Sequence, residues 1–223
     1  MKKVFAILLA LVLVVGFACA APNVAPEDYA TPTPEITEEQ PGAADEEPVA
    51  VPEEPVLTPE PEPTAMPDME VTSSGIVDGA LGLAYGDKGE QFVNSWIPSL
   101  SLPLTVNYIP EGTKTLALTM IDPDGGNWVH WLACNIAVDG TSYELQENAS
   151  IDMADSMVQG KNDFDPVGYG GPTPPSGVHT YVITVYALSD TLALDAGFRL
   201  AALQTAMEGL ILAEAVVTGT YAH

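Results

Sequence analysis

The chain has 223 residues, of which 31 are acidic and six are basic, so its formal net charge is −25 at pH 7. Lys and Arg are too few to neutralise a phosphate backbone, which excludes a nucleic-acid-binding protein. Two cysteines exclude a small secreted scaffold held together by several disulfides. Most of the 20 prolines lie apart from the long apolar stretches, and this separation divides the chain into three segments.

Residues 1–21 are predicted to be an export signal. Two lysines precede an unbroken apolar run of 12 residues, Val4–Val15, and small residues follow it. Cys19 could be the lipidated cysteine of a bacterial lipoprotein, whereas Ala18 and Ala20 around it also satisfy the A-x-A rule of ordinary signal peptidase. An uncleaved anchor is the third alternative, because the apolar stretch approaches the minimum span of a bilayer. All three routes export the remaining chain, either as a membrane lipoprotein that faces outward or as a secreted protein.

Residues 22–70 are predicted to form a disordered, acidic, Pro-rich linker. The segment contains 12 prolines and 14 acidic residues but no Lys, Arg or His. Such a composition cannot bury enough apolar surface to offset the entropy of ordering, and its like charges repel one another. We therefore expect a stiff, extended, polyproline-like tether.

Residues 71–223 are predicted to form one folded domain, with 17 acidic and four basic residues and a net charge near −13. A segment of about 150 residues suffices for a single well-buried core. Its only cysteine, Cys134, lies inside an apolar run and is interpreted as a small buried hydrophobe. The like-charged surface favours a monomer.

Period-two alternation of apolar and polar residues predicts half-buried strands at 115–121, 128–138 and 181–188, followed by a last strand at 210–221. Apolar residues at helical spacing predict a helix over about 199–208, which Gly209 ends. Between these elements, 141–178 lacks periodicity and is interpreted as a long irregular loop of the kind that tends to carry function. The pattern favours a mainly β fold, an antiparallel β-sandwich with a few short helices.

Two carboxylates, Asp122 and Asp124, lie in a turn at the end of one predicted strand. Alternation places Trp128 and His130 on one face of the next strand, with Val129 and Trp131 on the opposite face. An Asp-Pro-Asp-Gly turn is common in proteins, and a histidine in a strand is often an ordinary core residue. Each observation alone therefore has a structural explanation without any function.

A Gly/Pro-rich loop at 168–177 runs into the strand that carries His179 and Tyr181 on one face. His130 and His179 lie 49 positions apart without paired ligand spacing, so no metal site is predicted. Neither a G-x-S-x-G nucleophile motif nor a phosphate-cradling glycine loop is present, and no cofactor is predicted.

Several short motifs follow one another through the domain: SLPL at 101–104, PEGTK at 110–114, IDPD at 121–124, VHW at 129–131, GKNDF at 160–164, GYGGPTPPSG at 168–177, VYAL at 185–188, AMEG at 206–209 and GTY at 219–221. In this order they resemble the phosphatidylethanolamine-binding protein family, specifically its bacterial Raf-kinase-inhibitor-like branch. The resemblance implies a β-sandwich of antiparallel sheets with short helices. It also implies a small anion-accepting pocket lined by Asp122, Asp124, Trp128, His130, Gly171, Pro174, His179 and Tyr181.

Such a pocket has a plausible chemistry. Both histidines could donate hydrogen bonds to a phosphate or carboxylate, and either becomes cationic if a neighbouring carboxylate raises its pKa. An aspartate could hold one imidazole in the correct tautomer or accept a ligand ammonium group. The N–H groups of Gly170 and Gly171 could approach an anion closely, and Tyr181 and Trp128 would form walls.

The chain departs from the family's pattern at several positions. The branch usually has an Ala-Pro pair where Gly125 and Gly126 stand, Gly in place of Asp165 and His in place of Leu210. The branch usually has Arg between the histidine and the tyrosine at 179–181, and this chain has Thr180. The change removes a positive charge near the expected mouth of the pocket.

These observations favour a non-enzymatic domain that binds a small anionic or zwitterionic ligand outside the cell. A protein-binding inhibitor module and, less favoured, a hydrolase of small esters or phosphate esters are the alternatives. Direct binding to anionic membranes is disfavoured by the charge, so we expect membrane attachment only through an N-terminal lipid or anchor.

Overall fold

The computed structural model describes residues 67–223. The predicted export signal, Cys19 and the predicted linker up to residue 66 lie outside the described residues. Met69 is buried, and Glu70 pairs with Asn107, so ordered contacts begin slightly before residue 71. Within the described part of the chain, no helix combines the length and the apolar character that crossing a membrane requires.

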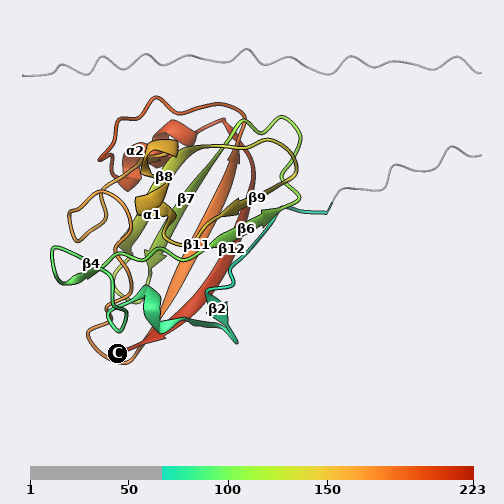
Figure 1. The fold of residues 1–223 in the computed structure, drawn as a ribbon. Coiled ribbons are helices and arrows are strands. Elements are labelled where there is room, and N and C mark those ends of the chain that lie inside the picture. Colours follow the sequence, from blue (N-terminus) through green and yellow to red (C-terminus); the bar gives the residue numbers. More distant parts are fainter. Residues whose placement is uncertain (1–66) are drawn as a thin grey trace, which may run out of the picture. The chain divides into compact units, whose positions relative to one another are not determined.

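Two sheets pack face to face, which confirms the predicted mainly β sandwich (Figure 1). Their strands pair antiparallel except for β12 and β3, which pair in parallel. The large sheet has the strand order β10 (Val158–Gln159), β8 (Trp128–Ala137), β7 (Thr115–Asp122), β11 (Val178–Leu188), β12 (Ile211–Ala222), β3 (Ala80–Leu81), β2 (Ile76–Val77). The small sheet has the order β1 (Glu70–Thr72), β6 (Leu104–Asn107), β9 (Ser142–Leu145). A separate pair joins β4 (Phe92–Val93) and β5 (Ile97–Pro98).

The helices are short: η1 (Leu83–Tyr85), α1 (Ala149–Asp152), η2 (Ala154–Ser156) and α2 (Leu200–Met207). The predicted helix and all four predicted strands are confirmed, with ends within one residue except that β11 begins three residues earlier than predicted. Gly209 follows α2 with a φ of +74°, the left-handed conformation that glycine adopts most easily after a helix.

Strands β7 and β8 are buried on both faces, which corrects the expectation of half-buried strands for these two. In β11, buried and half-buried residues alternate as predicted. One face of β7 and β8 meets the small sheet through the main core. The other face meets a second apolar cluster, in which Phe198, Leu203 and Met207 from the α2 region pack on Leu132 and the fully buried Cys134. The sequence of a strand could not show that the α2 region covers its second face, because the alternation pattern depends on the strand's own residues and not on the element that packs against it. Cys134 is confirmed as a buried hydrophobe, and burial raises the pKa of its thiol to about 11.

The predicted irregular loop at 141–178 is partly wrong, because β9, α1, η2 and β10 lie inside it. These elements have two to four residues each and depend on tertiary partners: β9 pairs with β6, and β10 pairs with β8. Segments this short carry no readable periodicity. The part that remains without strands or helices, 160–177, supplies one wall of the site described below.

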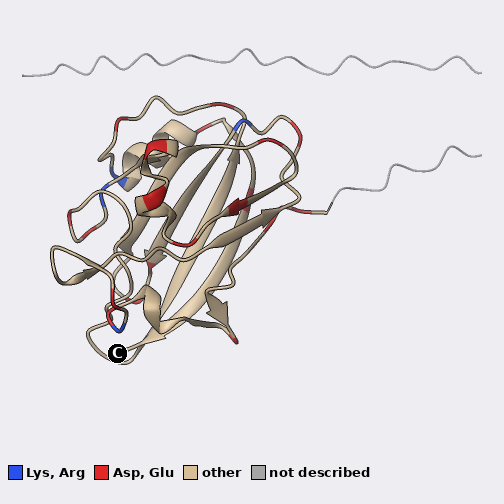
Figure 2. Cartoon of the chain, viewed as in Figure 1, with Lys and Arg blue, Asp and Glu red and all other residues tan. Residues whose placement is uncertain are grey.

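Acidic residues are distributed over loops and strand ends, and basic residues occupy a few loop positions (Figure 2). Each basic side chain of the described residues bonds to the protein itself. Their acceptors are the carbonyl oxygen of Ala222 for Lys88, Asp190 for Lys114, Asp165 for Lys161, and the carbonyl oxygen of Asn162 together with Asp165 for Arg199.

Candidate functional site

A cavity of about 410 Å³ lies at one end of the large sheet. The turn between β7 and β8, the first residues of β11 and the 160–177 loop meet there, because antiparallel pairing brings the end of β7 beside the starts of β8 and β11. The cavity is lined by Asp122, Asp124, Gly125, Trp128, His130, Phe164, Thr173, Pro174, Pro175, His179 and Tyr181.

The structure brings seven of the eight predicted site residues together around this cavity, and Gly171 is the exception. Sequence reasoning did not assign Gly125, Phe164, Thr173 and Pro175 to the pocket. All four belong to motifs or turns that the sequence already displays, next to predicted site residues. Their position within those motifs is the sequence feature from which their place in the pocket could have been predicted.

The glycines of the loop do not offer free N–H groups to a ligand, contrary to expectation. The N–H of Gly170 donates to the carbonyl oxygen of His130 at 2.9 Å, and that of Gly171 donates to the carbonyl oxygen of Pro98 at 2.8 Å. A Cβ on Gly171 would lie only 2.1 Å from the carbonyl oxygen of Tyr85. This glycine therefore permits close packing of the loop against the η1 region.

The loop is also held at its far end. The N–H of His223 donates to the carbonyl oxygen of Gly177 at 2.8 Å, and His223 Nδ1 lies 3.0 Å from the carbonyl oxygen of Pro174. These contacts connect the end of β12 to the loop that lines the cavity.

Asp122 and Asp124 are held by different parts of the surrounding backbone. Asp122 is buried, and its Oδ1 accepts the N–H of Gly125 at 2.8 Å. Asp124 is exposed, and its Oδ2 accepts the N–H of Thr180 at 2.7 Å. The first bond closes the β7–β8 turn, and the second ties that turn to β11.

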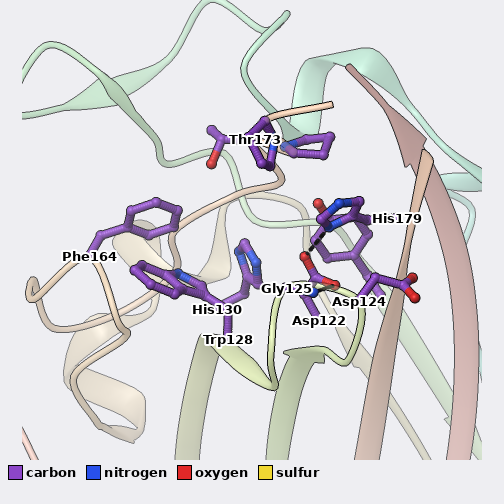
Figure 3. A pocket seen from close by; sticks show the side chains of 11 residues that line it. Asp122, Asp124, Gly125, Trp128, His130, Phe164, Thr173 and His179 are labelled. Atoms are coloured by element: carbon purple, nitrogen blue, oxygen red, sulfur yellow. Dashed lines mark hydrogen bonds and ion pairs between the residues drawn. The ribbon is translucent and has the colours of Figure 1, made fainter. Parts of the chain in front are cut away.

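His179 pairs with Asp122, with 2.7 Å between Nδ1 and Oδ2 (Figure 3). The carboxylate accepts the Nδ1 proton, which leaves Nε2 as the unbonded nitrogen of the ring. Of the two roles considered for the aspartates, Asp122 therefore holds an imidazole tautomer.

His130 is almost completely buried, and its Nδ1 lies 2.5 Å from the carbonyl oxygen of Gly170. A carbonyl can only accept, so Nδ1 carries the proton and the neutral ring has a lone pair at Nε2. Burial lowers the pKa of His130 to about 4, although the carbonyl of Gly170 and the charge of Asp122 oppose this shift. The expectation that either histidine could become cationic is wrong for His130 near neutral pH, because desolvation outweighs the neighbouring carboxylates.

A β-bulge at His130 changes the predicted faces of β8. Met120 pairs with Trp131 and Ile121 pairs with Val129, so His130 is the extra residue. Trp131 consequently packs in the main core, on the side opposite to Val129. The predicted shared face of Trp128 and His130 agrees with their lining one cavity, whereas the opposite placement of Trp131 is wrong because the bulge interrupts alternation.

Tyr181 completes the floor of the cavity beside His130, with a ring separation of 5.0 Å. Its side chain is fully buried, and its hydroxyl oxygen has no hydrogen-bond partner within the described residues. Burial and the nearby charge of Asp122 raise the pKa of this phenol. An unpaired buried hydroxyl is costly, and the cavity is the place where a ligand could satisfy it.

Aromatic rings form the opposite wall. Phe164 makes edge contacts with Trp128 at 5.4 Å, His130 at 5.6 Å and Trp96 at 5.6 Å between ring centroids. Figure 3 shows Trp128 and Phe164 on one side of the cavity, Asp122, Asp124 and His179 on the other, and His130 between them. The site therefore combines a carboxylate side with an aromatic side.

Metal binding is not supported by this geometry. Across residues 67–223, no group of three His, Cys, Asp or Glu side chains is arranged to hold a metal ion. The cavity instead presents hydrogen-bonding groups and aromatic walls, the combination found at sites for small polar organic ligands.

Known proteins resemble both the sequence and the structure. YxkA of Bacillus subtilis is 44% identical over 147 residues, a match that covers 58% of this chain and 84% of YxkA. The crystal structure of YbcL from E. coli, described as a member of the mammalian PEBP family, superposes with a TM-score of 0.60 at 30% identity and covers 70% of this chain and 99% of YbcL. CT736 of Chlamydia trachomatis, described as a putative phosphatidylethanolamine-binding protein homologue, gives a TM-score of 0.59 at 30% identity over 70% of this chain and 98% of CT736.

The model of the family described as phosphatidylethanolamine-binding protein matches residues 72–222. This range covers both sheets apart from Glu70 and Val71 of β1, and it includes every residue that lines the cavity. The chain belongs to the phosphatidylethanolamine-binding protein family.

Proposed function

We propose that the domain binds a small zwitterionic or anionic ligand of the phosphate ester type in this cavity and releases it unchanged. The observation that carries the proposal is the convergence of two histidines, two carboxylates and an unpaired buried hydroxyl on one cavity with an aromatic wall. Such pockets bury apolar parts of a ligand and orient it through a few polar groups. The family's name describes phosphatidylethanolamine binding, and the headgroup of that lipid is a zwitterion of this size.

A binding role is supported over catalysis by the lining groups. No serine or cysteine is among the described residues that line the cavity. The hydroxyl of Thr173 makes no hydrogen bond with either imidazole in the described part of the chain, so it lacks the adjacent base that activates a nucleophile. Turnover of generic esters or phosphate esters at any pH from about 5 to 8 would contradict a binding role.

Export and tethering form a second part of the proposal, which rests on the sequence alone. The first 21 residues have the features of an export signal, and Cys19 is the candidate lipidation site. The acidic Pro-rich segment would then hold the domain away from the membrane. Labelling of cells with a radioactive fatty acid would tag the wild-type chain and not Cys19→Ser if the protein is lipidated.

A protein-binding inhibitor role is the alternative, and one feature favours it. An apolar rim beside the cavity consists of three aromatic residues, Phe92, Trp96 and Trp128, and of Val93, with exposed fractions of 37%, 58%, 39% and 36%. Exposed aromatic side chains are typical of the centres of protein interfaces. Substitution of Trp96 by Ala would weaken a protein complex while leaving a small ligand in the cavity nearly unaffected.

Calorimetric titration of the full chain with phosphorylethanolamine tests the leading proposal. We expect saturable binding that His179→Ala and His130→Ala both abolish. Circular dichroism spectra at matched concentration would show whether His130→Ala remains folded, and His130→Gln provides a second variant with a polar side chain. Absence of binding by a folded wild-type chain would refute the proposal for this ligand class.

A further inference from the structure

A second cavity, of about 710 Å³, lies at the opposite end of the large sheet from the ligand site. Its walls come from the turn at 108–113 before β7, the turn at 140–141 after β8 and the start of β12. The ligand site lies at the other ends of β7 and β8. Because β7 has eight residues, at about 3.3 Å per residue, the two cavities are roughly 25 Å apart.

The first described residues of the chain line this second cavity. Pro67, Asp68 and Met69 belong to its lining. Glu70 then pairs with Asn107, so the chain enters the domain antiparallel to β6 and beside its end. The segment that ends at residue 66 is therefore joined to the second cavity by a single peptide bond.

The walls of the second cavity carry uncovered apolar surface. The side chains of Tyr108 and Leu212 both line it, and each residue is 45% exposed. A Cβ on Gly112 would lie 4.0 Å from Cδ1 of Leu212, so the turn at 108–113 and the start of β12 are neighbouring walls. An apolar occupant would remove both exposed side chains from water.

The wall that carries Tyr108 is fixed by the backbone. Tyr108 has a φ of +56°, a left-handed conformation that persists in a bulky residue only where the surroundings impose it. The N–H of Ile109 donates to the carbonyl oxygen of Thr141 at 2.9 Å, and the hydroxyl of Thr113 donates to the carbonyl oxygen of Pro110 at 2.7 Å. Such a preformed wall loses little entropy when an occupant binds.

Charge restricts which part of the chain can occupy the second cavity. The lining includes Asp68 and Glu111 and, among the described residues, no Lys or Arg. An acidic segment would be repelled there. The four residues 63–66, Pro-Thr-Ala-Met, are uncharged, whereas Glu60 and Glu62 lie just before them. The uncharged stretch of the linker is thus the part that adjoins the cavity.

Proline-containing segments suit a wall of this kind. In an extended polyproline conformation they dock against aromatic side chains, and their restricted backbone reduces the entropy lost on binding. Four such residues span about 12 Å at about 3.1 Å per residue. Covalent attachment gives a segment next to its site an effective concentration on the order of millimolar, so even a weak contact is populated.

From these observations we propose that residues 63–66 bind in the second cavity against Tyr108 and Leu212. The docked segment fixes the direction in which the acidic linker leaves the domain. Because this exit lies at the opposite end of the large sheet, the ligand site faces away from the linker. The inference goes beyond the proposed function, since it holds whether or not a ligand binds.

NMR relaxation of the full chain tests the proposal through the backbone order parameters of Ala65 and Met66. We expect values of about 0.8, typical of a rigid backbone, whereas a mobile backbone gives values below about 0.6. Values below 0.6 for both residues in the wild-type chain would overturn the proposal.

Two substitutions identify the second cavity as the place of binding. Leu212→Ser removes an apolar wall, and we expect the order parameters of Ala65 and Met66 to fall below about 0.6. Val216→Ser is the matched control, because Val216 is another exposed apolar residue of β12, at 53%, and does not line the second cavity. Equal effects of the two variants would contradict the proposal. Tyr108→Asn removes the aromatic ring while asparagine tolerates the left-handed backbone, so a folded variant is expected.

The other outcomes distinguish different occupants and separate this inference from the proposed function. If the amide shifts of Gly112 and Leu212 vary with protein concentration while Ala65 and Met66 stay mobile, a second copy occupies the cavity and the proposal is wrong. Titration of Leu212→Ser with phosphorylethanolamine should match that of the wild type. Failure of both chains to bind this probe would refute the proposed function and leave the docking of 63–66 intact.

Discussion

The two histidines of the cavity face the same space but belong to different environments. His130 lies on the aromatic side, is 2% exposed and bonds to a backbone carbonyl. His179 lies on the carboxylate side, with a side chain that is 14% exposed, and bonds to Asp122. Burial keeps the first ring neutral, whereas the second ring donates its Nδ1 proton to a carboxylate. The partner of Nδ1 and the degree of burial, more than the residue type, determine what each ring contributes.

The two sides of the cavity also differ in the contacts that position their histidines. The position of His130 depends on the bulge in β8 and on the 160–177 loop, which is fixed by close packing of Gly171. The position of His179 depends on side-chain bonds within the β7–β8 turn and β11. Substitutions can therefore disturb one side while leaving the other in place.

Gly171→Ala should have the largest effect on the His130 side. The added Cβ would lie 2.1 Å from the carbonyl oxygen of Tyr85 and 2.9 Å from Pro98, so the loop must move. We expect a loss of about 3 kcal/mol in the free energy of unfolding, measured by urea denaturation. Gly126→Ala is the control: its Cβ meets nothing within 4 Å, and its φ of +78° makes the expected cost about 1 kcal/mol. Similar losses in the two variants would contradict the role assigned to Gly171.

Acidification should destabilise the protein through His130. The unfolded chain binds a proton at this ring below about pH 6.5, whereas the folded chain resists protonation until about pH 4, so its contribution to stability is present above 6.5 and is lost as the pH falls. The difference corresponds to about 3 kcal/mol between these pH values. We expect the pH dependence of the unfolding free energy of His130→Gln to be smaller by about that amount. Identical pH profiles for wild type and variant would show that the ring is not held neutral by folding.

Asp122→Ala should destabilise the carboxylate side. Asp122 is buried and accepts bonds from Gly125 and His179, so its removal leaves donors without a partner, at an expected cost of about 2 kcal/mol. Asp124→Ala removes an exposed acceptor and should cost less than about 1 kcal/mol in the same urea measurement. A larger loss of stability for Asp124→Ala than for Asp122→Ala would contradict the greater structural role assigned to Asp122.

Thr180→Arg should have the smallest effect and should act on ligand binding alone. The N–H of Thr180 contacts the Asp124 carboxylate, so an arginine at this position adds a positive charge close to the carboxylate side. We expect inorganic phosphate to bind about two- to threefold more tightly, with little change in stability. Thr184→Arg, four residues along β11 on the same face, adds the same charge farther away and should leave the affinity unchanged. Weaker phosphate binding by Thr180→Arg would contradict an anionic ligand group beside this position.

Long elements and their neighbours in the chain were predictable from the sequence. The strands that became β7, β8, β11 and β12, and the helix α2, each have enough residues for alternation or helical spacing to be read. The turn residues around Asp122 and the Gly/Pro loop were visible as motifs, and seven of the eight expected residues lie around one cavity. Elements of two to four residues were not predictable, because pairing with distant strands stabilises them.

The amino-acid sequence by itself determined the mainly β architecture, the positions of its long strands along the chain and the buried character of Cys134. It also indicated that the aspartates, the histidines and the Gly/Pro loop lie at strand ends. Only the tertiary structure decided how those residues are used. The bulge moved Trp131 into the core, the covering helix buried the second face of the central strands, and packing engaged the N–H groups of Gly170 and Gly171 within the protein. The charge and hydrogen-bonding capacity of a side chain depend on burial and on partners distant in the chain, and local sequence patterns carry no direct record of either.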